Sequence, residues 1–375
     1  MRIAALAAFT ALVAATAVHA QDNSGQFDGN KVENPMASMG DTVSDGDMDK
    51  FMKARSANPT ISAPPPNKFR SSAPDLTVES FKRVTRSANG DISEAPAAPG
   101  TEESIEKLKK SGEGMDRSRM QRRAPTNSDI ELGENSGQAK GNRTVIGTDD
   151  RIRVDQTNQY PFSTLGYIYS EYDDNTAGSC SGTMISPTLV LTAAHCVYRT
   201  ETSKWATYVV FVPGRNDRQA PLGQFEAAQW TITQGYLDQS GKEYGYDHLF
   251  HDVAVLELKE PAGKATGWLS IGYNDQLPNF HGNVIGYPGD KPDGTMWSAS
   301  CPIDPNFIAP SLFEMECDTY PGSSGSSIYA FYKEQDKRVI YGVNVASTDK
   351  ANYGIRITGP YFDYLKTFMD AQKKQ

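Results

Sequence analysis

The residue best suited to covalent chemistry in this chain is a serine flanked by glycines. Ser324 lies in the stretch Gly-Ser-Ser-Gly-Ser that begins at Gly322, a small polar turn followed by an apolar run, residues 328–331. A hydroxyl is a poor nucleophile at neutral pH, so such a serine needs a general base and a site that stabilises an oxyanion. Small residues on both sides allow the backbone N–H groups of Gly322 and Ser324 to point at one spot. The glycine flanks favour Ser324 over the neighbouring serines, although a Gly/Ser cluster by itself is more typical of a plain loop.

A histidine and an aspartate elsewhere in the chain could supply the base and the acid that orients it. His195 follows a β-type run and precedes Cys196, and Asp252 stands directly before the alternating run 253–258. Alone, each is more often a structural histidine or the cap of a strand. Together, the order His195, Asp252, Ser324 is one of the chain orders known for the serine-protease triad. Ser326 occupies the place of the last glycine of Gly-x-Ser-x-Gly, which disfavours an α/β-hydrolase elbow.

The elements that must hold these residues are short strands. From residue 145 onward, apolar runs recur every 8–15 residues between turn residues, a pattern that predicts an all-β barrel or sandwich pair rather than βαβ units. One helix is predicted at the end, with Pro360 in its first turn. The predicted strands are 162–170, 179–185, 189–192, 207–211, 224–232, 253–259, 283–287, 295–301, 312–316, 326–331, 339–346 and 353–357.

The first 144 residues have a different texture. Residues 1–20 have the charged start, apolar run and small −3 and −1 residues of a secretory signal peptide, which disfavours a membrane anchor. Residues 21–144 are rich in Ser, Pro, Gly and charge and poor in aromatics, so we expect them to be mostly disordered. Two short solvated helices are expected there, around 76–84 and 102–110. Residues 145–375 form the expected folded domain.

Charge and cysteine content narrow the functional classes. The 375 residues carry a net charge of −9, which argues against a nucleic-acid binder. The four cysteines form two couples, each 16 residues apart: Cys180 with Cys196, and Cys301 with Cys317. Their even number fits an oxidising compartment, and no Cys-x-x-Cys spacing favours a metal site. We therefore expect two local disulfides and no metal.

These motifs resemble a known family. Thr-Ala-Ala-His-Cys, Asp-Val-Ala-Val-Leu and Gly-Ser-Ser-Gly-Ser resemble the chymotrypsin-fold serine peptidases, and more closely their secreted bacterial glutamyl endopeptidase branch. The resemblance implies two six-stranded Greek-key barrels with the triad in the cleft between them. It also implies synthesis as an inactive precursor, with residues 21–144 as its propeptide, and no metal or organic cofactor. Further similar stretches are residues 145–151, 213–216, 286–291, 294–297 and 318–320.

The specificity pocket departs from the family pattern. Thr319 matches the pocket threonine, and the resemblance implies that the freed amine of Val145 adds a positive charge. Asn344, however, occupies the place of the family histidine, and an amide brings no charge to a substrate carboxylate. Asp318 could instead select Arg or Lys, as in trypsin-like enzymes, or could be structural. Preference for Glu or Asp at the P1 substrate residue and a trypsin-like preference both remain open.

The sequence thus predicts a secreted serine endopeptidase, extracellular or periplasmic, made as a zymogen. Its expected partners are protein or peptide substrates and a processing protease that cuts near Arg143, with Arg122-Arg123 as an alternative site. We expect a monomer without a membrane anchor or bound nucleic acid. A catalytically silent binding or adhesion protein on the same fold is the alternative from another class.

Overall fold

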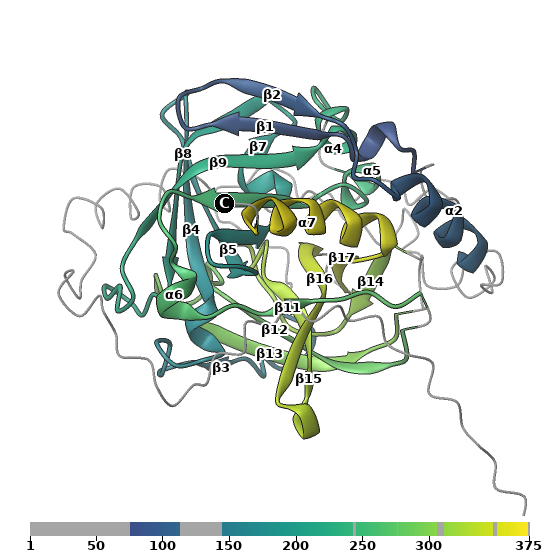
Figure 1. The fold of residues 1–375 in the computed structure, drawn as a ribbon. Coiled ribbons are helices and arrows are strands. Elements are labelled where there is room, and N and C mark those ends of the chain that lie inside the picture. The colour runs from purple at the N-terminus through teal and green to yellow at the C-terminus, as the bar shows by residue number, and fades with distance from the viewer. Residues whose placement is uncertain are drawn as a thin grey trace, which may run out of the picture.

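The computed structural model describes residues 76–112, 145–242, 245–275, 277–305, 311–347 and 351–373. The expected signal peptide, the rest of residues 21–144 and the candidate cleavage site at Arg143 lie outside these residues. Within them the chain is built mainly of β-strands in two sheets, with a helix at the C-terminal end (Figure 1). None of the described helices is long and apolar enough to cross a bilayer.

The first sheet closes into a six-stranded barrel. Its strands follow the order β9-β10-β6-β5-β4-β8, and β8 returns to pair with β9. The strands are antiparallel to their neighbours, and most of their residues are buried. They are β4 (Leu165–Tyr172), β5 (Ala177–Met184), β6 (Leu189–Thr192), β8 (Lys204–Pro213), β9 (Phe225–Thr233) and β10 (Ala254–Leu258).

The second sheet curls into a half-barrel. Its main strands follow the order β14-β17-β16-β15-β12-β13, and within the described residues no pairing joins β13 back to β14. A separate apolar cluster fills it, with Phe313 and Ile328 fully buried. The six strands are β12 (Phe280–Gly286), β13 (Trp297–Ile303), β14 (Leu312–Met315), β15 (Ser327–Tyr332), β16 (Lys337–Ser347) and β17 (Asn352–Arg356). The architecture is the chymotrypsin-like fold that the sequence predicts, and each of the twelve predicted strands overlaps one of these.

Short elements connect the strands, and one long helix ends the chain. α7 (Gly359–Gln372) has Pro360 in its first turn, as predicted, and buries Tyr361, Tyr364 and Leu365 against the first barrel. The remaining short elements are β3 (Ile152–Arg153), β7 (Tyr198–Arg199), β11 (Ser270–Ile271), α4 (Gln234–Leu237), α5 (Tyr246–Leu249), α6 (Gly263–Thr266), η3 (Phe162–Thr164), η4 (Ala194–Cys196) and η5 (Lys333–Gln335).

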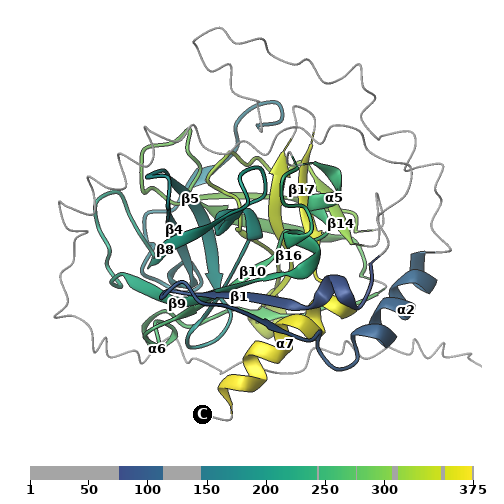
Figure 2. The same cartoon turned by 90° about the horizontal axis from the view of Figure 1, so that it is seen from above.

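Residues 76–112 correct the expectation for the N-terminal segment. They form a 3₁₀ turn η1 (Glu79–Phe81), a hairpin of β1 (Arg83–Ser87) and β2 (Ile92–Ala95), and the helix α2 (Thr101–Gly112). The hairpin extends the first sheet beyond β9, and α2 packs against α7 (Figure 2). The helix expected over 76–84 is therefore wrong, because most of that stretch is a 3₁₀ turn and a strand. The helix expected over 102–110 is present but is not fully solvated, because Ile105 and Leu108 are buried.

Candidate active site

The histidine and the aspartate singled out in the sequence meet where β6 ends and β10 begins. His195 lies in η4 directly after β6, and Asp252 lies directly before β10, which pairs with β6. Because neighbouring antiparallel strands place the end of one beside the start of the next, the two side chains are brought together. Asp252 Oδ2 lies 2.7 Å from His195 Nδ1, and Asp252 Oδ1 accepts a hydrogen bond from the His195 backbone N–H at 2.9 Å. Asp252 is fully buried and His195 nearly so.

This double contact determines which nitrogen of the His195 imidazole carries the proton. A carboxylate can only accept, so the His195 Nδ1 atom must carry the proton in the hydrogen bond to Asp252. The other ring nitrogen, Nε2, is then left as the proton acceptor in the neutral ring. The pair therefore has the arrangement of a general base held by an orienting acid.

The Ser324 turn is held against the same region by its backbone. Ser181 N–H of β5 donates to the Ser324 carbonyl oxygen at 2.8 Å, and Cys196 Sγ lies 3.9 Å from the same oxygen. Since Cys196 follows His195 in the chain, this contact brings the serine turn beside the histidine turn. Ser324 is partly exposed, whereas its neighbours Ser323 and Ser326 are buried. Among these serines, Ser324 is the one that a substrate can reach.

Glycines on both sides of Ser324 permit the sharp turn. Gly322 has φ +102° and Gly325 has φ +84°, backbone angles that residues with a side chain rarely adopt. A Cβ at Gly325 would collide with the Ser181 carbonyl, so no larger residue fits there. The Ser323 N–H is already used in a hydrogen bond to the Tyr320 carbonyl. This use agrees with an oxyanion site built from the N–H groups on either side, those of Gly322 and Ser324.

Two disulfides tie the site to the two sheets. Cys180 is joined to Cys196, and Cys301 to Cys317, which is the local pairing expected from the sequence. The sulfurs of Cys180 and Cys196 lie within 4.8 Å of a His195 ring nitrogen, a grouping that resembles a metal site. Because both sulfurs are in a disulfide and no thiolate is available, this group does not offer a metal-binding set.

The predicted pocket residues lie near the serine turn. Thr319 is buried, and its hydroxyl lies 3.5 Å from the Ser347 hydroxyl. Asn344 is also buried, and its Nδ2 donates to the Ser323 carbonyl at 3.1 Å, while its Oδ1 has no hydrogen-bond partner among the residues that the structure describes. Asn344 therefore uses one amide N–H in a hydrogen bond to the turn that carries Ser324.

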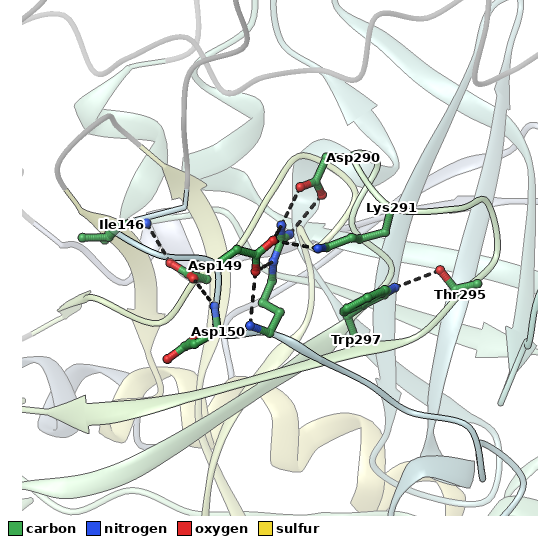
Figure 3. A network of polar contacts seen from close by, with 9 residues as sticks. Ile146, Asp149, Asp150, Asp290, Lys291, Thr295 and Trp297 are labelled. Atoms are coloured by element: carbon green, nitrogen blue, oxygen red, sulfur yellow. Dashed lines mark hydrogen bonds and ion pairs between the residues drawn. The ribbon is translucent and has the colours of Figure 1, made fainter.

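Asp318 has a role that the sequence left open. Its carboxylate accepts hydrogen bonds from the backbone N–H groups of Ile146 at 2.7 Å and Asp150 at 3.2 Å (Figure 3). Burial raises the pKa of the Asp318 carboxyl above its usual value. Because both oxygens face the segment after Val145, Asp318 acts as an anchor for that segment, which is the structural interpretation.

A second anchor beside Asp318 was missed in the sequence. The Arg151 guanidinium is nearly fully buried and forms ion pairs with both Asp149 and Asp290 (Figure 3). Lys291 forms a further ion pair with Asp149 at 2.6 Å. The Arg151 side chain holds the pKa of Asp149 well below its usual range. The only sequence signal was an arginine closely preceded by two acids. Together with Asp318, this network fixes residues 146–151 on the second sheet.

Comparisons with known proteins agree with this geometry. The trypsin-like peptidase domain model matches residues 180–334. The glutamyl endopeptidase of Bacillus licheniformis is 32% identical over 236 residues, covering 61% of this chain and 70% of that protein. A Bacillus subtilis protein named extracellular metalloprotease is 28% identical, covering 60% of this chain and 69% of that protein. The solved structure of a Glu endopeptidase in complex with MPD has a TM-score of 0.52 and 26% identity, covering 60% of this chain and 98% of that one.

Proposed function

Because the chain belongs to the glutamyl endopeptidase family of chymotrypsin-fold serine peptidases, and is thus a serine endopeptidase, we propose that it cleaves peptide bonds with His195, Asp252 and Ser324. The observation that carries this proposal is the buried His195–Asp252 pair, in which both carboxylate oxygens bond the same histidine. The reachable serine turn beside Cys196 supports the third role.

The reaction proceeds in two halves. In the first, Ser324 Oγ attacks the carbonyl carbon of the substrate while His195 Nε2 takes the hydroxyl proton. The N–H groups of Gly322 and Ser324 stabilise the oxyanion, and loss of one such donor costs about 3–4 kcal/mol in the barrier. The C–N bond then breaks, and the imidazolium gives its proton to the leaving amine. An acyl-enzyme ester at Ser324 remains.

In the second half, water replaces the amine. His195 takes a proton from the water as its oxygen attacks the ester carbonyl, and the same N–H groups stabilise the second oxyanion. Collapse breaks the ester bond, returns the proton to Ser324 and releases the carboxylic acid product. In both halves Asp252 holds the ring in one tautomer and stabilises the imidazolium charge.

For specificity, we propose a P1 preference for Glu or Asp that is weaker than a histidine-containing pocket would give. Thr319 and the amine of Val145, once freed by cleavage, are the groups that bind the carboxylate. Asn344 contributes little, because its Nδ2 is bonded to Ser323. A trypsin-like preference is not supported, because the Asp318 carboxylate faces Ile146 and Asp150.

The proposal extends to maturation. The chain is exported by the signal peptide at residues 1–20, and a processing protease activates it by cutting near Arg143 to give a start at Val145. The anchored segment 146–151 supports this scheme, because Ile146, the residue after Val145, donates its backbone N–H to Asp318 and Arg151 pairs with Asp290. N-terminal sequencing of the secreted enzyme should find a start at or near Val145. A start before Arg122 would contradict the scheme.

Two assays test the proposed function. A library of peptides that differ only at P1, digested by the mature enzyme, should show Glu and Asp hydrolysed faster than Arg and Lys. The Ser324→Ala variant should lose turnover of every peptide, while Ser323→Ala, a neighbouring hydroxyl without a proposed chemical role, should keep it. Undiminished turnover in Ser324→Ala, or a clear Arg and Lys preference, would overturn the corresponding part of the proposal.

A further inference from the structure

The hairpin of residues 83–95 pairs with the part of β9 that β8 leaves unpaired. β8 pairs only with the first part of β9, at Phe225 and Glu226. β1 pairs with the rest, in register from Arg83 opposite Thr233 to Ser87 opposite Gln229. Figure 1 shows β1 lying along β9, with β2 outside it. β1 therefore occupies strand edge that would otherwise have unpaired backbone groups.

Phe81, just before β1, is the apolar anchor of this segment. Its side chain is fully buried and meets the Tyr361 ring edge-on, with 5.0 Å between the ring centroids. Its ring centroid also lies 6.5 Å from that of His251, the residue before Asp252. The backbone N–H of Gln234 donates to the Lys82 carbonyl at 2.8 Å, which fixes the turn. Phe81 thus fills the space between α7 and the turn that leads into the catalytic aspartate.

A second anchor lies further along the chain, in α2. Ile105 and Leu108 are three residues apart on α2, so they share one face of the helix, and both are buried. α2 packs against α7 (Figure 2), and the Ser104 hydroxyl on α2 donates to Asp363 on α7 at 2.5 Å. Phe81 and the buried face of α2 therefore both hold residues 76–112 against the domain that ends with α7.

We propose that residues 76–112 stay bound to residues 145–373 as a second, non-covalently attached chain after the precursor is cut. This inference rests on the proposed cleavage near Arg143. Release of residues 76–112 would expose the apolar ring of Tyr361 and the backbone hydrogen-bonding groups at the β9 edge. A folded domain rarely leaves such surface exposed. All four cysteines lie at or beyond Cys180 and pair with one another, so the attachment is not covalent. The segment acts as a structural subunit of the active enzyme.

The test is a controlled cut in the full chain. Residues 21–375 with Ser324→Ala receive a site-specific protease sequence between Asn127 and Ser128, and the cut protein is analysed by size exclusion and native mass spectrometry. We expect both fragments to elute together with the summed mass and to separate only in denaturant. Separate elution in native buffer would overturn the proposal. Because this background has no nucleophile, the result is independent of whether the wild type hydrolyses peptides, so failure of the proposed function is told apart.

Variants locate the attachment. Phe81→Ala should weaken binding of the N-terminal fragment about 10²- to 10³-fold, the usual effect of removing a buried Phe ring. Ile92→Ala is the matched control, because that apolar side chain on β2 is 50% exposed and its loss should leave binding unchanged. If Phe81→Ala does not fold, Ser104→Ala should still release the fragment several-fold faster by removing the bond to Asp363. Equal binding in the anchor variants and the control would contradict the proposal.

Discussion

Replacement of Asp252 by Asn tests how the histidine is held. The side chain keeps its size, and its oxygen must stay on the His195 backbone N–H, where Asp252 Oδ1 now accepts at 2.9 Å. The amide NH₂ group then faces His195 Nδ1, which Asp252 Oδ2 now contacts at 2.7 Å. Because both groups cannot donate, the ring must move its proton to Nε2. In that tautomer His195 has no acceptor for the Ser324 proton.

The expected loss is large and confined to kcat. The wrong tautomer in a serine-protease triad lowers kcat by about 10⁴-fold, which corresponds to about 5 kcal/mol in the barrier. Steady-state hydrolysis of one peptide gives kcat and KM, and a urea titration gives the free energy of unfolding. KM and fold should change little, because the shape and the backbone hydrogen bond are retained.

A matched control separates chemistry from charge. Glu257→Gln makes the same carboxylate-to-amide change on β10, outside the histidine pair, and should leave kcat unchanged. The orienting role of Asp252 would be contradicted if Asp252→Asn kept kcat within about tenfold of the wild type, a difference of only about 1.4 kcal/mol. An equal loss in both variants would also refute it.

Three further perturbations follow from the contacts around the site. Replacing Cys180 and Cys196 together by Ser should lower the free energy of unfolding by about 2–4 kcal/mol and reduce kcat, because the disulfide also borders the serine turn; urea titration and peptide hydrolysis test both, and an unchanged kcat would argue against that positioning. Burial lowers the pKa of His251 from 6.5 to about 4, so between these pH values the unfolded chain binds more protons than the folded one. The free energy of unfolding should therefore fall by on the order of 3 kcal/mol as the pH drops from about 6.5 to 4. Unfolding measured at several pH values should show a flatter pH profile for His251→Gln, and equal profiles would exclude this cause. Gly325→Ala should prevent folding or cost several kcal/mol, since its φ is +84° and a Cβ would strike the Ser181 carbonyl; a normal thermal melt would contradict that geometry.

The β-architecture of residues 145–375 could be predicted because its signal is local and repeated. The run 189–192 is predicted and observed with the same bounds, and the other predicted strands are displaced only at their ends. The strands β3, β7 and β11, of two residues each, are too short to produce a pattern. The closure of one sheet and the openness of the other depend on pairing between distant strands, which no local pattern contains.

The folding of residues 76–112 was missed because composition averages over many residues. A polar, aromatic-poor stretch predicts little burial, yet Phe81 needs only one cavity on the rest of the protein to become fully buried. Its partner Tyr361 lies 280 positions away, so no nearby residue indicates the contact. Tertiary contacts, rather than local composition, therefore determine that residues 76–112 are folded.

The candidate site divides in the same way. His195, Asp252 and Ser324 carry recognisable local contexts, and the structure brings the first two into contact. The direction of a side chain is not encoded locally, so the sequence left two interpretations for Asp318. Only the fold shows that its oxygens meet Ile146 and Asp150.

The proposed triad is tested most directly by identifying which serine is nucleophilic. The mature enzyme is treated with a fluorophosphonate, and the labelled residue is identified by mass spectrometry of its peptides. We expect one label per molecule, on Ser324, and no label after His195→Ala, because the base is then missing. Absence of label on the wild type, which a silent binding protein would show, or label on another residue would contradict the assignment of Ser324.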